Sequence, residues 1–397
     1  MNKTPRHLMF ALLYFSQGAI MSFFTALNAL YLQSFGLQMS VIGIIGTIAM
    51  IPFILKIFLG LLSDKVNFFG LGFRKPYIVL GLLIQTVCLL IVPKVDPGKN
   101  FLHYAGLAFI LMTGMALYDT CTDGLALDTT PVEEEGIIQG FMVGGRAAGM
   151  VVVSAFLGVI AQNFSWAAGF YFLALITLVP LPFLFFTKEA IKTPDRSFEW
   201  RSFNKFKEIS VVTLAILGAL YSLIINGANQ LINPFLTEKF SINLSEAGFI
   251  ATVIGIGIIA GSAAGGVITD KIGQRKSVQY ALVISLVSIG LIAAINQQWI
   301  VWLIIFIFGF AYGFYETVYF AIAMRLTDGR IAATMFSILM AVANIGTGIG
   351  LGVTGLMSDS WGFIPSFLIL ATLNLAAIPL IMLIFPTTRK IEAGFPH

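Results

Sequence analysis

The chain has 397 residues, of which 58% are hydrophobic and only 11% are charged, and its mean hydropathy of +0.93 excludes a soluble protein of ordinary composition. The formal net charge of +4 gives no indication of nucleic-acid binding. Cys88, Cys121 and the three histidines (His7, His103 and His397) show neither metal-ligand spacing nor a nucleophile–base arrangement. We therefore predict no metal site, no cofactor and no enzymatic activity.

Apolar stretches of about 20 residues, each long enough to span a bilayer, recur along the whole chain. Spans are predicted at 8–32, 41–62, 76–93, 102–127, 137–160, 168–187, 210–236, 246–268, 277–295, 300–325, 332–356 and 364–385. These runs are continuous, whereas the strands of a membrane barrel alternate apolar and polar residues. We predict an all-α membrane protein with 12 transmembrane helices in two six-helix halves, residues 1–187 and 210–397, joined by a cytoplasmic linker at 188–209.

The positions of lysine and arginine predict the orientation in the membrane. With the N-terminus inside, the cytoplasmic segments hold 18 of the 23 basic residues, and the opposite face holds only Lys94, Lys99 and Lys239. Lys56 and Arg146 lie within spans. Both termini are therefore predicted to be cytoplasmic. No cleavable signal is evident, and short loops favour a bacterial inner membrane.

One loop pattern occurs twice. Residues 60–76 read GLLSDKVNFFGLGFRKP, and residues 266–277 read GVITDKIGQRKS. Each copy places a glycine on the helix, an Asp-Lys pair at the helix end, and then a glycine and a basic pair. Asp64 and Asp270 are 206 residues apart, about half the chain. Six helices, a basic linker and six more helices are the pattern of a transporter built from parallel repeats.

This loop resembles the signature between the second and third helices of the major facilitator superfamily. In that family the loop is a conformational latch in which the aspartate pairs with basic residues. The resemblance implies a latch role for Asp64, Arg74, Lys75, Asp270, Arg275 and Lys276. The first copy departs from the pattern because NFFGL is inserted at 67–71. Alternatively, these basic residues only set the topology.

Five charged residues lie inside predicted spans: Lys56, Asp119, Asp123, Arg146 and Glu316. At 1.5 Å per residue, four of them lie about 12–13 Å from the cytoplasmic side, near the midplane. Asp123 lies one turn from Asp119 on the same helix face. Charges within a membrane are costly, and they usually face a partner or a water-filled path.

Two interpretations of this layer remain open. In the first, the charges form a buried ion network that holds four helices together. In the second, the three acids exceed the two bases by one, and like charges close together favour a carboxylate that binds a proton. The second interpretation makes Asp119, Asp123 or Glu316 the proton-coupling acid, in that order of preference, and makes Lys56 and Arg146 contacts of an anionic substrate.

Uncharged polar residues on the spans complete the candidate site. The amides are Gln17, Asn28, Asn226, Asn229, Gln230 and Asn344, and the tyrosines are Tyr14, Tyr118, Tyr221, Tyr312 and Tyr315. We predict that the amides contact substrate, and the cluster on the seventh span is the best candidate. The alternative is that each amide makes an ordinary hydrogen bond between helices.

Glycines at close spacing line three spans: Gly140, Gly144, Gly145 and Gly149 on the fifth, Gly257, Gly261 and Gly265 on the eighth, and Gly346, Gly348, Gly350, Gly352 and Gly355 on the eleventh. Small residues let helix backbones approach closely. In the superfamily, helices five and eight, and helices two and eleven, meet across the two halves. We therefore expect these glycines to form moving contacts between the halves, and the alternative is close static packing of helices.

Two regions narrow the resemblance. The first contains Asp119, Asp123, Asp128, Pro131, Glu133, Glu134 and Gly136, and the second contains Ala333, Thr334, Phe336 and Leu339. Both are similar to AmpG-type muropeptide permeases, and acetyl-CoA transporters of the same branch carry a similar pair of aspartates. The stretch FRKPYIVLG at 73–81 also resembles folate-biopterin carriers. The AmpG resemblance implies proton-driven import, with Asp119 and Asp123 as functional acids.

The leading hypothesis is a monomeric, proton-coupled symporter that imports a polar or anionic organic solute, such as a muropeptide-like amino-sugar compound, by alternating access. Its partners would be the lipid bilayer, the solute and protons, with no nucleic acid. One alternative is a facilitator or antiporter of another small solute, such as a folate-like compound, a coenzyme A ester or a drug. Another is a non-transporting membrane assembly factor, in which the midplane charges would pair off fully.

Overall fold

The structure is a computed structural model that describes residues 3–67, 72–129, 135–185, 207–326 and 332–385. All regular elements in these residues are helical. The predicted linker at 188–209 lies outside the described residues as far as residue 206, so the division into two halves at that linker stays a prediction.

The first half of the described chain begins with the helices that correspond to the six predicted N-terminal spans. They are α1 (Lys3–Ser22), a π-helix (Phe23–Leu27), α2 (Asn28–Gln33), α3 (Met39–Ile54), α4 (Lys56–Lys65), α5 (Lys75–Ile91), a 3-10 helix (Val92–Lys94), α6 (Phe101–Thr129), α7 (Glu135–Asn163), α8 (Trp166–Leu178) and α9 (Leu181–Phe185).

The second half contains the helices that correspond to the six C-terminal spans. They are α10 (Ile209–Phe240), α11 (Leu244–Ile272), α12 (Gln274–Ala293), a 3-10 helix (Gln298–Ile300), α13 (Val301–Leu326), α14 (Ala332–Trp361), α15 (Phe363–Leu373), a 3-10 helix (Asn374–Ala376) and α16 (Ala377–Ile384). Each predicted span therefore matches one helix or a run of consecutive helices, and the all-α fold class is confirmed.

Eleven helical stretches in the described residues are long and apolar enough to cross a membrane. The second predicted span is not among them because it is broken at Leu55, between α3 and α4. Pro52 lies inside α3 just before the break. Proline lacks an N–H and its ring clashes with the preceding turn, so it interrupts a helix near its position. The break leaves Lys56 as the first residue of α4.

The outward surface of the bundle is apolar. Large side chains on several helices are more than half exposed, among them Phe156, Leu175, Val283, Leu356 and Met382. A soluble monomer rarely exposes so much contiguous apolar surface, whereas lipid tails solvate it without cost. The exposed side chains therefore mark the surface that faces the bilayer.

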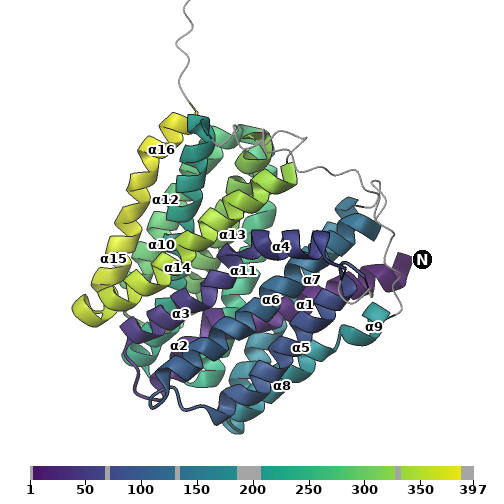
Figure 1. Cartoon of the computed structure of the whole chain (residues 1–397). Helices are drawn as coiled ribbons and strands as arrows, with labels where there is room; N and C mark the ends of the chain where they lie inside the picture. The colour runs from purple at the N-terminus through teal and green to yellow at the C-terminus, as the bar shows by residue number, and fades with distance from the viewer. Residues whose placement is uncertain (1–2, 68–71, 130–134, 186–206, 327–331, 386–397) are drawn as a thin grey trace, which may run out of the picture.

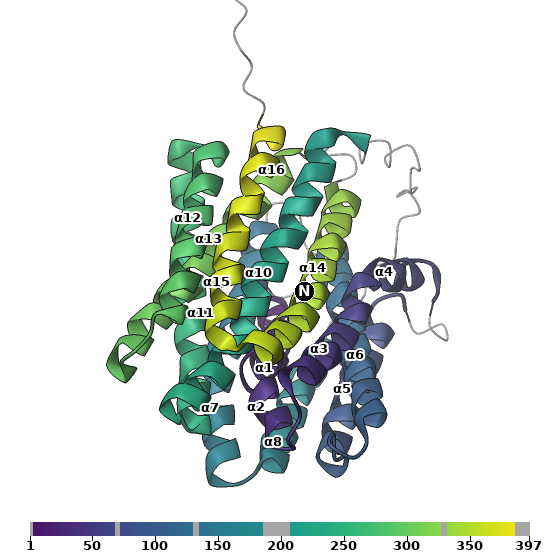
Figure 2. The same cartoon turned by 90° about the vertical axis from the view of Figure 1, so that its left-hand side faces the viewer.

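The bundle has two ends. We call the end that holds Lys3, the end of α4 and the end of α16 the terminal end, and the end that holds the first turns of α3 and α11 the distal end. In Figure 1 the terminal ends of α10, α12 and α16 lie at the top and those of α1, α7 and α9 lie at the right, so the halves splay apart there. Figure 2 shows the same bundle from the side, with α4 standing away from α16.

At the distal end the two halves are packed together. Backbone contacts join α3 to α14 at Gly355, where a Cβ atom would overlap the Met39 carbonyl group. A matching contact joins α7 to α11, where Gly158 lies against Gly248. The glycines thus permit the close approach of helices that the sequence predicted to meet.

The other predicted glycine contacts differ from expectation. Gly145 and Gly149 of α7 pack on Ala11 and Phe15 of α1, within the first half. In the same way, Gly257 and Gly261 pack on α13, and Gly346 and Gly350 pack on α10, within the second half. Gly348, Gly352 and Gly355 do face α3 across the halves. Glycines at four-residue spacing therefore mostly fix helices inside each half, because a tightly packed pair needs a whole stripe of small residues.

Candidate functional site

Three of the predicted midplane charges form one cluster between α4 and α6. The Lys56 ammonium lies 2.5 Å from Asp119 Oδ2 and 3.4 Å from Asp123 Oδ2. Because four residues separate the two aspartates, both carboxylates face the same way from α6. The break at Leu55 begins a new helix at Lys56 and thereby positions its side chain toward α6.

Helix α1 supplies a second donor to each carboxylate. Gln17 Nε2 donates to Asp119 Oδ1 at 2.9 Å, and the Tyr14 hydroxyl donates to Asp123 Oδ1. The side chain of Asp119 is 6% exposed, whereas that of Asp123 is 42% exposed and that of Lys56 is 30% exposed. Asp119 is therefore enclosed by its donors, and Asp123 and Lys56 face an accessible space.

The other two predicted charges lie on opposite halves and are not bonded to each other. Arg146 of α7 and Glu316 of α13 are both partly exposed, and neither forms an ion pair or a hydrogen bond with any described residue.

A polar group on the second half lies one turn from Glu316. The Tyr312 hydroxyl donates to Asn226 Oδ1 at 3.2 Å, and Asn226 Nδ2 lies 3.2 Å from Thr347 Oγ1. The Tyr221 hydroxyl donates to the Tyr312 carbonyl oxygen. This group joins α10, α13 and α14, and it includes Asn226, one of the predicted amides.

The remaining predicted amides tie helices together. Asn229 Nδ2 reaches the Thr25 carbonyl oxygen at 3.4 Å, Asn344 Nδ2 reaches the Phe53 carbonyl oxygen at 3.4 Å, Gln230 Nε2 donates to the Leu351 carbonyl oxygen at 3.1 Å, and Asn28 Oδ1 accepts from Tyr104 at 3.5 Å. Asn229 and Asn344 bridge the two halves. In this conformation these four amides therefore make the interhelical bonds that were the alternative to substrate contact.

The first predicted latch involves an acid that the latch prediction did not include. Arg74 Nε lies 3.0 Å from Asp128 Oδ2 at the end of α6, and Arg74 Nη1 donates to Ser63 Oγ at 2.8 Å. The side chain of Asp64 lies outside the described residues, and Lys75 is partly exposed at the start of α5. In the second copy, Asp270, Arg275 and Lys276 are exposed at the terminal end.

Two polar closures at the distal end were not predicted. Asp359 of α14 accepts hydrogen bonds from the backbone N–H groups of Met39 at 3.0 Å and Ser40 at 2.6 Å, the first residues of α3. Gln162 of α7 accepts a bond from the backbone N–H of Leu244 at 3.0 Å, the first residue of α11. The first turn of a helix has N–H groups without an intrahelical acceptor, so a side chain from the other half satisfies them.

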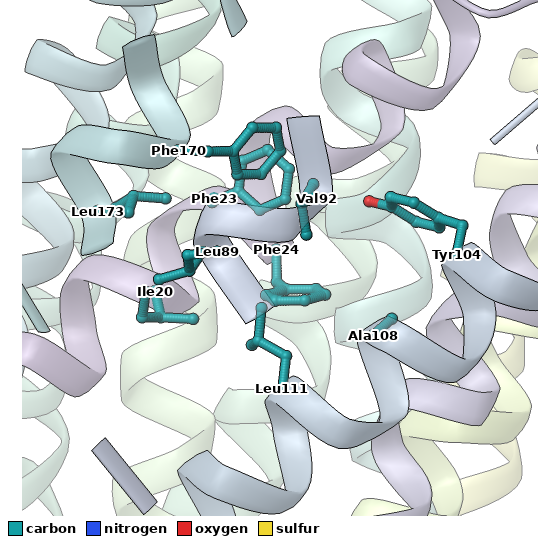
Figure 3. A pocket seen from close by; sticks show the side chains of 10 residues that line it. All are labelled: Ile20, Phe23, Phe24, Leu89, Val92, Tyr104, Ala108, Leu111, Phe170 and Leu173. Atoms are coloured by element: carbon teal, nitrogen blue, oxygen red, sulfur yellow. The ribbon is translucent and has the colours of Figure 1, made fainter. Parts of the chain in front are cut away.

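Two cavities in the described residues lie away from the charged layer. The first is a narrow apolar cavity inside the first half, shown in Figure 3, between α1, α5, α6 and α8. Its lining includes Phe23 and Phe24 of the π-helix and Phe170 of α8, and the labelled rings point into it. The second lies between α12 and α16. Neither contains the five charges.

Comparison with known proteins agrees with this architecture. The family model described as "Major Facilitator Superfamily" matches residues 9–233 and 214–396. The anhydromuropeptide permease of Escherichia coli (strain K12) is 21% identical over 98% of this chain and 81% of its own length. The putative transporter AmpG 1 of Rickettsia conorii is 25% identical over 90% of this chain and 91% of its own length.

A third relative, the sialic acid transporter NanX of Escherichia coli (strain K12), is 24% identical over 58% of this chain, and the match spans 56% of that protein. Among solved structures, a bacterial homologue of the lysosomal transporter Spinster, in an inward-facing and unoccupied conformation, has a TM-score of 0.77 at 16% identity over 96% of this chain and 95% of that one. The nucleoside transporter NupG (D323A mutant) has a TM-score of 0.79 at 15% identity over 96% and 100%.

The helix count, the repeated loop and the two AmpG-like regions therefore led to the correct family and branch. The relatives are transporters and not enzymes. The chain belongs to the major facilitator superfamily and is a multi-pass membrane transporter.

Proposed function

We propose that the chain is a secondary active transporter that imports a polar, anionic organic solute together with protons by alternating access. It would lie in a cell inner membrane with both termini in the cytoplasm. The terminal end then faces the cytoplasm, so the conformation described here is closed to the outside.

One observation supports the proposed proton coupling: two carboxylates, those of Asp119 and Asp123, share the single ammonium group of Lys56. With Asp119 and Asp123 both ionised, the cluster around Lys56 has a net charge of −1, and it becomes neutral when one proton binds. Neutral clusters cost less to move through a low-dielectric region than charged ones. Asp123, with its side chain 42% exposed, gives the pair access to protons from the open side.

The substrate class is argued from the basic residues and the relatives. Lys56 and Arg146 both reach the accessible layer, and Arg146 has no bonded anion among the described residues. Relatives whose names state their solute include transporters of anhydromuropeptides, sialic acid and cis,cis-muconate. All three solutes carry carboxylate groups, so an organic anion such as a muropeptide-like amino-sugar compound fits the site.

The assembly-factor alternative requires midplane charges that pair off completely. The Lys56 cluster meets that requirement in part, but Arg146 and Glu316 remain unbonded on opposite halves. Unbonded charges in a membrane interior are costly, and they are retained where a solute passes. A facilitator or antiporter of the same fold is separated from a symporter only by measuring proton movement.

Proton flux in proteoliposomes tests the proposal. Anhydromuropeptides, sialic acid, folates and coenzyme A esters form the solute panel, with a pH-sensitive dye inside the vesicles. Asp119→Asn or Asp123→Asn leaves Lys56 with one carboxylate, so the cluster is neutral without a proton. We expect solute-driven proton flux in the wild type and none in either variant, with Asp96→Asn in an exposed loop as the control. Solute movement without protons would establish a facilitator instead.

A further inference from the structure

The cavity between α12 and α16 is large enough to hold part of an organic molecule. Its volume is about 240 Å³, whereas the cavity shown in Figure 3 has about 10 Å³, which fits one water molecule at most. The terminal ends of α12 and α16 lie at the top of Figure 1, on the second half of the bundle. The cavity is therefore separate from the charged layer that the proposed function uses.

The lining of this cavity follows one face of each helix. The side chains from α12 are spaced by four, three and four residues, and the two from α16 are spaced by four, so each set forms a single stripe. The stripes contain Arg275, Gln279, Leu282 and Leu286 of α12 and Ile378 and Met382 of α16. The groove is thus cationic and polar at its terminal end and apolar over the next two turns.

A break in the last predicted span produces the groove. Pro379 lies in the first turn of α16, and a proline ring clashes with the carbonyl group four residues earlier, here that of Leu375. The chain accordingly changes to a 3-10 helix at Asn374–Ala376. Before this break α15 packs extensively on α12, whereas after it α16 contacts α12 much less. Space therefore opens between α12 and α16 from Asn374 to the terminal end.

The groove opens on the surface that faces the bilayer. Three of its lining side chains are strongly exposed: Val283 by 59%, Leu375 by 52% and Met382 by 61%. Arg275 and Leu286 are eleven residues apart, about 16 Å along the helix. One leaflet of the hydrocarbon core is about 15 Å thick. The groove therefore extends through one leaflet, from the level of the head groups to the midplane.

The terminal end of the groove is positively charged. Between residues 270 and 276, three exposed basic side chains (Lys271, Arg275 and Lys276) stand against one exposed acid, Asp270, for a net charge of +2. A guanidinium binds a phosphate group with two parallel hydrogen bonds. Basic pockets between membrane helices bind anionic head groups, whereas a head group with its own ammonium would be repelled by these bases.

We propose that the groove between α12 and α16 binds an anionic phospholipid, whose phosphate group contacts Arg275 and one of whose acyl chains lies along Leu282 and Leu286. The inference goes beyond the proposed function, because it requires only that the chain spans a membrane. It gives Arg275 a role other than the latch that the repeated loop implies. In the proposed orientation the lipid belongs to the cytoplasmic leaflet.

Native mass spectrometry of the purified full-length chain in detergent tests this site. Phosphatidylglycerol and phosphatidylethanolamine with identical acyl chains are the probes, and the dissociation constant of the first bound lipid is measured for each. We expect phosphatidylglycerol to bind about five-fold or more tightly, the size of one basic contact to an anionic lipid. Equal binding of the two lipids would overturn the proposal.

Matched variants locate the head group and the chain. Arg275→Gln should remove the preference for phosphatidylglycerol, whereas Lys276→Gln removes the same charge from the next residue, which does not line the groove, and should keep it. Val283→Trp fills the groove and should weaken both lipids about ten-fold. Its control is Val287→Trp, an exposed position one turn further along α12 and outside the lining. The thermal stability of each variant is measured, so that loss of folding is not mistaken for loss of binding.

Three further outcomes would overturn the proposal. An equal effect of Lys276→Gln and Arg275→Gln would reduce the preference to general attraction by surface charge. Displacement of the lipid by an equal concentration of glycerol phosphate would assign the site to a soluble phosphate. A lipid-free dimer that Val283→Trp dissociates would assign the groove to a second copy of the chain. Because binding is measured without solute or a proton gradient, none of these results affects the proposed transport function.

Discussion

The distal and terminal ends of the bundle are built from the same pairs of helices but are joined very differently. At the distal end α3 meets α14 and α7 meets α11 through glycine contacts, and hydrogen bonds cross between the halves. At the terminal end the helices of the two halves diverge, as Figure 1 shows. The difference teaches that the described hydrogen-bonded closures between the halves are concentrated at the distal end.

The closure at the distal end repeats itself in the two halves. Near the end of the fifth span of each half, one side chain accepts hydrogen bonds from the first turn of the second span of the other half. Asp359 does so for α3, and Gln162 does so for α11. The two acceptors differ in charge, so the α3 contact also gains from the positive end of the helix dipole.

A covalent link across the contact between α3 and α14, about three turns inward from Met39, would have the largest expected effect on the comparison. A Cβ atom at Gly348 of α14 would lie 3.7 Å from the Met50 Cβ atom of α3, which is within the Cβ–Cβ range of disulfides. We expect Met50→Cys combined with Gly348→Cys to form a disulfide under oxidation and to abolish solute uptake. Adding a reductant should restore uptake.

The two single-cysteine variants are the controls for this experiment, and oxidant should leave their uptake unchanged. The wild-type thiols of Cys88 and Cys121 are buried within the first half, and the controls report any effect of the oxidant on them. Full uptake by the oxidised double variant, with the cross-link confirmed by mass spectrometry, would show that these helices do not separate during transport.

Removing the charge of Asp359 should have a smaller effect. Asp359→Asn keeps one acceptor oxygen for the α3 N–H groups and loses the charge, which destabilises the distal contact by about 1–2 kcal/mol. That loss corresponds to an increase of about ten-fold in the population with an open distal end. The measurement is the yield of the Met50–Gly348 cysteine cross-link within a short oxidation pulse, which we expect to fall. An unchanged yield would show that the glycine contacts alone hold the closure.

The sequence predicted the fold because its signals were local and strong. Apolar length defined the spans, and the paired loops around Asp64 and Asp270 indicated two halves. Span depth also placed Lys56 at the level of Asp119, and in the structure these two residues form a salt bridge. Helical periodicity placed Asp123 on the same face of the same helix. These predictions need only the rise and the twist of a helix.

The pairing of side chains across helices could not be predicted in the same way. Depth put Arg146 in the same layer as the Lys56 cluster, but rotation about the axis of α7 decides which acid it faces, and that rotation depends on packing against α1. The break at Leu55, which begins a new helix at Lys56, had a signal in Pro52. No signal in the sequence predicted the role of Asp359, because an acid near the end of a span is more often simply exposed.

The smallest expected effect concerns Gln162, and it sharpens the comparison between the two closures. Gln162→Leu removes one neutral hydrogen bond to the first residue of α11, which is worth about 1 kcal/mol. We expect the ratio of open to closed distal ends to rise by about two- to five-fold, less than for Asp359→Asn, and the cross-link yield to fall by correspondingly less. Gln162→Glu supplies a charged acceptor at the helix terminus and should raise the yield above that of the wild type. A Gln162→Leu effect as large as that of Asp359→Asn would mean that the helix dipole contributes nothing to the closure, and that the two contacts act as one unit.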